Sequence, residues 1–97
     1  MAVDPGALDA TLAAAVGDDP LLAAELRAAF VAALDSAQGA LCEATTVEGW
    51  TVAADRIEAI AGSFGAQRLM ADARDARRRP HDTSAVKRLA RQIDRLR

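Results

Sequence analysis

Apolar residues recur every three or four positions along most of this chain, which is the period of an α-helix. An aspartate followed by a proline marks two helix starts, because Asp can cap a helix and Pro fits its first position. The pattern predicts five helices: one from Asp4-Pro5 to Gly17, then roughly 20–44, 47–63 and 66–78, the last of these stopped by Pro80, and a final helix that begins near Asp82.

Each predicted helix has one apolar face that should be buried. The connections are short, so successive helices should lie antiparallel. We therefore expect a single all-α domain over residues 1–97, an antiparallel up-down four-helix bundle with a short extra N-terminal helix. The faces comprise Leu8, Leu12, Ala15 and Val16; Leu22, Leu26, Ala29, Phe30, Ala33, Ala37 and Leu41; Trp50, Ala53, Ala54, Ile57, Ala61 and Phe64; Leu69, Met70, Ala73 and Ala76; and Val86, Leu89, Ile93 and Leu96.

Two local signals refine the boundaries of the helix over 47–63. Thr45 and Glu48 have the spacing of a capping box at its start. Gly65 can supply the left-handed turn that closes it.

Composition supports the helical prediction and limits the chemistry. Alanine, the strongest helix former, is the most frequent residue, and tyrosine is absent. The single cysteine, Cys42, rules out an intramolecular disulfide, and we expect it to be a small buried hydrophobe. One histidine and one cysteine leave no material for a catalytic triad or a zinc site, and the six glycines form no phosphate loop. The N-terminus lacks the pattern of a signal peptide, and no apolar run could span a membrane, so we expect a cytoplasmic protein.

The net charge of −2 conceals an asymmetry along the chain. Residues 1–65 hold ten acids and two arginines, whereas residues 66–97 hold ten bases and four acids. We expect the basic end to be a solvated helix face. The alternative is an adaptor that binds an acidic partner there. A nucleic acid is not expected, because no aromatic residue interleaves with the bases. The adaptor's bases would be Arg74, Arg77, Arg78, Arg79, Arg88, Arg91 and Arg95.

The helix over 47–63 also carries a second, solvent-facing stripe: Asp55, Glu58, Ala59 and Gly62. These positions lie between about 80° and 180° from Trp50, whereas Ala54, Ile57, Ala61 and Phe64 lie within about 40° of it. The two small residues would let a partner surface approach closely, so we predict a partner-binding surface. We expect Asp55 and Glu58 to be a solvated pair, and no metal site, because a dedicated site needs more ligands.

The stretch WTVAADRIEAIAGSFGAQRL, residues 50–69, resembles the signature of the histidine-containing phosphotransfer (HPt) family. The resemblance covers about residues 4–96, and GSFGA at 62–66 is its most specific part. It implies a helical bundle and a place in two-component phosphorelay signalling. The matching positions are Ala54, Ile57, Ala61, Phe64, Gly65, Ala66 and Leu69, preceded by Asp19-Pro20 and by Leu26, Phe30 and Leu34.

The chain departs from the family pattern at the residues that carry the chemistry. Asp55 stands where the family has its phosphorylated His, Glu58 where it has a Lys, and Ala59 where it has a Gly. The first change removes the nucleophile, and the second reverses the charge beside it, so the site should repel phosphate. The resemblance thus implies a degenerate member, without catalytic residues or cofactor, that docks a response-regulator receiver domain without transferring phosphate.

An active phosphotransfer protein with a different acceptor is the remaining alternative. His81 follows Pro80 and lies near Arg77, Arg78 and Arg79, which could attract phosphate. We expect this loop histidine to be solvated. The sequence does not fix the oligomeric state, and apolar faces larger than one bundle can bury would favour a dimer.

Overall fold

The helices of this chain begin and end close to the predicted signals. The computed structural model describes residues 5–97, with side chains from residue 8 onward, and it holds five helices and no strand within them. The all-helical prediction is confirmed, and the predicted cap at Asp4 lies outside the described residues. The helices are α1 (Pro5–Val16), α2 (Pro20–Glu43), α3 (Val47–Ser63), α4 (Gln67–Arg77) and α5 (Thr83–Asp94).

Side-chain caps fix three of the helix starts. Asp19 accepts hydrogen bonds from the amides of Leu21 and Leu22 at 3.0 and 3.1 Å, as the Asp-Pro signal predicts. The capping box at Thr45 is wrong by one residue. Thr46 caps α3 by accepting from the amide of Gly49 at 3.0 Å, which leaves Glu48 one position too early to complete the box. At the start of α5 the cap is Asp82.

Glycines in the left-handed region turn the chain after two helices. Gly65 has a φ of 68°, as predicted for the end of α3, and Gly17 has a φ of 65° after α1. L side chains rarely adopt this conformation, so glycine is the residue that these turns favour.

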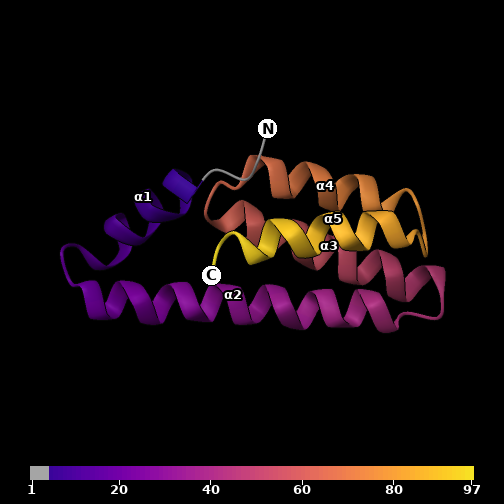
Figure 1. Ribbon diagram of the computed structural model, residues 1–97, viewed down its shortest axis with the longest axis horizontal. Coiled ribbons are helices and arrows are strands. Elements are labelled where there is room, and N and C mark those ends of the chain that lie inside the picture. Colours follow the sequence, from indigo (N-terminus) through magenta and orange to yellow (C-terminus); the bar gives the residue numbers. More distant parts are fainter. Residues whose placement is uncertain (1–4) are drawn as a thin grey trace.

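Four of the helices pack in a ring of neighbours. α2 packs on α3, α3 on α4, α4 on α5 and α5 on α2, while α1 packs on α2 (Figure 1). Successive helices among α2–α5 run in opposite directions, and α5 crosses in front of α3 in this view. In the described residues the backbones of α3 and α5 make no contact within 8 Å. The outward faces of α3 and α5 therefore belong to helices that do not pack together.

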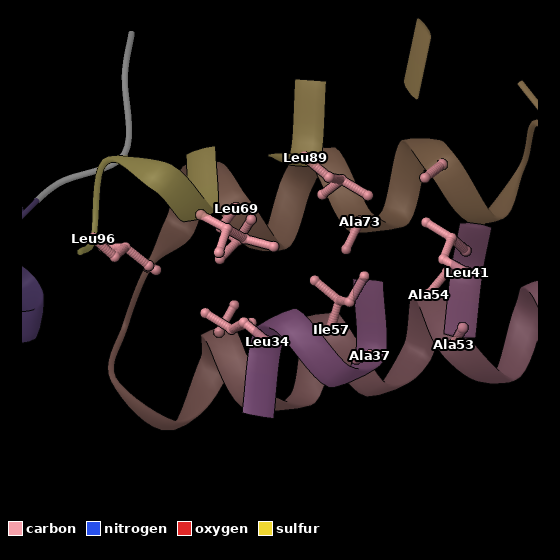
Figure 2. Close-up of a cluster of buried hydrophobic side chains, with 14 of the residues drawn as sticks. Leu34, Ala37, Leu41, Ala53, Ala54, Ile57, Leu69, Ala73, Leu89 and Leu96 are labelled. Atoms are coloured by element: carbon pink, nitrogen blue, oxygen red, sulfur yellow. The ribbon is translucent and has the colours of Figure 1, made fainter. Parts of the chain in front are cut away.

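The core lies between these helices and mixes large side chains with alanines (Figure 2). Alanines on α3 and α4 let those two helices approach closely, and Leu and Ile side chains from all four fill the space between them. The indole N–H of Trp50 donates to the carbonyl of Ala76 at 2.6 Å, which ties α3 to α4 and satisfies a buried donor. The buried apolar residues shown include Leu34, Ala37, Leu41, Ala53, Ala54, Ile57, Leu69, Ala73, Leu89 and Leu96.

The predicted apolar faces hold well for α3 to α5 and less well for α2. Of the residues assigned to α2's face, Leu22 is 47% exposed and Ala29 is exposed. Val31 and Leu34, which were not assigned to that face, are buried. The reason is length: α2 has 24 residues, whereas α4 and α5 have 11 and 12, so its N-terminal half extends past them (Figure 1). Ala15 of α1 is also exposed.

The expectation of a buried Cys42 is wrong. Cys42 is exposed, because Leu41 takes the inward position on α2 and the next residue lies about 100° around the helix. Within the described part of the chain, no helix combines the length and the apolar character that crossing a membrane requires.

Candidate functional site

The outward face of α3 carries the stripe that the sequence predicts. Asp55, Ala59 and Gly62 are exposed and Glu58 is half-buried. The opposite face of the same helix, with Trp50 and Ile57, lies in the core. The structure thus brings the four predicted residues together on one accessible surface.

Two arginines from α4 complete this cluster, and the sequence did not indicate them as part of it. Arg77 donates to the Asp55 carboxylate at 2.6 Å and approaches Glu58 at 3.8 Å, while Arg74 donates to Glu58. The expectation of a solvated carboxylate pair is therefore wrong. Because α4 packs beside α3, its three-residue spacing of arginines meets the three-residue spacing of the acids.

The pairing changes the electrostatic character of the stripe. The hydrogen bond to Asp55 raises the pKa of Arg77 above its usual value, and the nearby charges of Asp55 and Glu58 add to this effect. Two carboxylates thus face two guanidinium groups. The stripe is therefore locally neutral, whereas the expectation that it repels phosphate counted the charges of α3 alone.

The stripe has only small side chains at Ala59 and Gly62, and the surface around it extends further than the sequence indicated. A methyl group added at Gly62 would lie 3.5 Å from the Cε of Met70, which is ordinary contact, so Gly62 and Ala59 leave the backbone accessible without a steric need for glycine. Val52 is 68% exposed on the same outward face. Its position three residues before Asp55 and seven before Ala59 could have identified it.

His81 lies away from the stripe. Its backbone adopts the left-handed region with a φ of 65°, and its ring packs against Trp50 with centroids 5.4 Å apart. Trp50 belongs to the buried face of α3, whereas Asp55 belongs to the exposed face. His81 instead lines a surface pocket together with Cys42, Thr83 and Lys87.

Most bases of the C-terminal third are exposed, as expected for a solvated face, but six of the ten bases in residues 66–97 also make ion pairs within the molecule. Arg88 binds Asp75 at 3.1 Å, Arg79 approaches the same carboxylate at 3.3 Å, and Arg97 binds Asp35 at 2.7 Å. The hydrogen bonds to Asp35 and Asp94 raise the pKa of Arg97. Within residues 8–97, four bases of this third make no ion pair: Arg78, Lys87, Arg91 and Arg95.

In the part of the chain that the structure describes, no three His, Cys, Asp or Glu side chains gather into a group that could hold a metal ion. Comparison of the chain with family models, with curated proteins and with solved structures gives no match. We therefore infer a function from Asp55, Glu58, Ala59 and Gly62, which we call the α3 stripe, and from their neighbours.

Proposed function

We propose that this chain is a degenerate HPt-like protein that docks the receiver domain of a response regulator and does not carry phosphate. We also propose that the fold is an antiparallel up-down four-helix bundle formed by α2 to α5, in which α1 is the extra helix. It also places the protein in the cytoplasm, in phosphorelay signalling. The observation that carries it is the α3 stripe, where Asp55 occupies the position of the family's phosphorylated histidine and is bound by Arg77.

The chemistry of the stripe supports binding without transfer. A carboxylate held by a guanidinium is a poor nucleophile, because its negative charge is already stabilised by a charge-assisted hydrogen bond. No imidazole occupies this surface within the described residues, since His81 packs on Trp50. Ala59, Gly62 and Val52 supply a low surface that a partner can cover.

The docked state would exchange one set of charge partners for another. A receiver active site is acidic and holds Mg²⁺, so the Asp55 carboxylate would approach the metal while Arg77 turns to the receiver's own carboxylates. Because Arg77 is bound to Asp55 by a single exposed hydrogen bond, this exchange breaks only one close contact. Docking should therefore be stronger with Mg²⁺ than without it.

A binding titration tests the proposal. The wild-type chain is titrated against purified receiver domains encoded near its gene, with and without Mg²⁺, by calorimetry. We expect saturable binding to at least one receiver that weakens when the metal is removed. Absence of binding to every receiver under both conditions would overturn the proposal.

Two arginine substitutions provide a matched pair for this titration. Ala59→Arg puts a long charged side chain on the α3 stripe and should reduce the affinity at least about tenfold, because an unpaired charge must be buried against the partner. Ala28→Arg makes the same change at an exposed position of α2 and should leave the affinity unchanged. Equal loss in both variants would mean that the receiver does not dock on α3.

A further inference from the structure

The outward face of α5 presents a line of bases without acidic partners. Lys87, Arg91 and Arg95 are exposed and follow one another at four-residue spacing, which is about 6 Å of helix rise per step. The opposite face of the helix, with Leu89 and Ile93, is buried in the core. Within residues 8–97 none of the three bases makes an ion pair. We call these three residues the α5 stripe.

Three acids on or beside α5 are already bound to other bases. Asp75 pairs with Arg88 and Arg79, Asp82 approaches Arg79 at 3.9 Å, and Asp94 accepts a hydrogen bond from Arg97 at 3.0 Å. The α5 stripe is thus left with its like charges side by side on one helix. Like charges at i,i+4 are destabilising in water, and an acidic partner would relieve that repulsion.

We propose that the α5 stripe is a second interaction surface, and that it binds an acidic segment of another protein. A helix with carboxylates at every fourth position has the same repeat as the stripe, so three ion pairs can form at once.

Charge and composition favour a protein segment over the other polyanions. The chain carries a net charge of −2, and tight binding to duplex DNA depends on many phosphate contacts. A membrane surface would need large apolar side chains beside the bases. The large exposed apolar side chains of residues 8–97 lie instead on α2 and α3: Leu21, Leu22, Val47 and Val52.

The position of the α5 stripe leaves the α3 stripe accessible. α5 packs on α4 and α2 and has no backbone contact with α3 in the described residues, so the two stripes lie on helices that do not pack together (Figure 1). A single helical segment bound along α5 can therefore leave Asp55 and Ala59 uncovered. The proposal does not depend on the receiver-binding function, and either can fail without the other.

Fluorescence anisotropy with a synthetic probe tests the α5 stripe. The probe is a labelled helical peptide with glutamate at every fourth position on an alanine background, and a short labelled DNA duplex is run in parallel. At low ionic strength we expect the wild-type chain to bind the peptide more tightly than the duplex. Absence of peptide binding, or tighter binding of the duplex, would overturn the proposal.

Two charge reversals of equal size locate the binding. Arg91→Glu reverses the middle of the α5 stripe and should weaken peptide binding at least about fivefold, because it replaces an attraction by a repulsion. Arg56→Glu makes the same change at an exposed arginine of α3 that has no ion pair in the described residues, and it should change the affinity less than about twofold. Equal weakening in both would assign the binding to net charge alone and overturn the proposal. The milder Arg91→Gln, checked by circular dichroism, serves if Arg91→Glu does not fold.

Discussion

The outward faces of α3 and α5 differ in electrostatic character, although both are charged in the sequence: the first is locally neutral and the second is positive. On α3, Asp55 and Glu58 are matched by Arg74 and Arg77 from the neighbouring helix. On α5, Lys87, Arg91 and Arg95 have no such match in residues 8–97. The formal charge of a helix face therefore does not give its net surface charge, because bases or acids on the adjacent helix can neutralise it by ion pairing.

The same comparison separates two modes of recognition. The α3 stripe is locally neutral and has small side chains, so a partner would bind it through close contact and through exchange of charge partners. A surface with unmatched charge, such as the α5 stripe, attracts its partner at longer range and should respond steeply to salt.

Removing the core beneath either face should have the largest effect on stability. Ile57 supports the α3 stripe and Leu89 supports the α5 stripe, and both side chains are fully buried. Ile57→Ala and Leu89→Ala should each lower the free energy of unfolding by about 2–5 kcal/mol, because each leaves a cavity. Urea unfolding measures this. Val52→Ala on the exposed face is the control and should stay within about 0.5 kcal/mol of wild type.

Making the α3 stripe resemble the α5 stripe should have the next largest effect. Asp55→His combined with Glu58→Lys removes both acids and sets new basic groups beside Arg74 and Arg77. The melting temperature should fall by several degrees, and inorganic phosphate should raise it more in this variant than in wild type. The same ionic strength of chloride is the control. A variant that melts like wild type and ignores phosphate would contradict the ion-paired site.

Neutralising one charge on each face should give small effects of opposite sign. Glu58→Gln breaks the pair with Arg74 and should lower the free energy of unfolding by about 0.2–1 kcal/mol. Arg91→Gln removes repulsion from Lys87 and Arg95 and should raise it by about 0.2–0.5 kcal/mol. Urea unfolding at low salt measures both values, and high salt should reduce the difference between them. Losses of equal size in the two variants would contradict the comparison.

The smallest effect concerns the contribution of Asp82, the N-cap of α5, to stability at low pH. The hydrogen bonds from the hydroxyl and then the amide of Ser84 lower the pKa of Asp82 below its usual value. A lowered pKa means that Asp82 contributes its stability above the unfolded pKa of about 3.9 and loses it as the pH falls through the folded value. Melting temperatures recorded below about pH 4 should therefore fall less steeply in Asp82→Asn than in wild type. Identical acid dependence in the two proteins would contradict this role of Asp82.

Periodicity predicted most of the fold because each of α3, α4 and α5 has one buried face. Trp50, Ile57 and Leu89 lie where the helical period places them. α2 was harder to predict, since its N-terminal half carries apolar residues on several sides and extends past its shorter neighbours. Leu22 was misplaced for that reason, since the pattern of one helix does not show how far the next helix covers it. Cys42 was misplaced because Leu41 beside it takes the inward position.

The sequence predicted the residues of the candidate site that lie on α3, but not those that α4 contributes. Asp55, Glu58, Ala59 and Gly62 share a face because they share a helix, and the helical period gives that directly. The roles of Arg74 and Arg77 depend on the alignment of α4 against α3, which follows from packing of the core and has no local signal. Charge complementarity between the three-residue spacings on the two helices is visible only once they are side by side.

One experiment tests the central claim, that the chain docks a receiver without accepting its phosphate. A receiver labelled with radioactive phosphate on its aspartate is mixed with the chain, and the same sample is divided between a native gel and a denaturing gel. We expect a complex on the native gel that contains the label, and label only on the receiver in the denaturing gel. Label transferred to the chain would contradict the loss of transfer, and the absence of any complex would contradict docking.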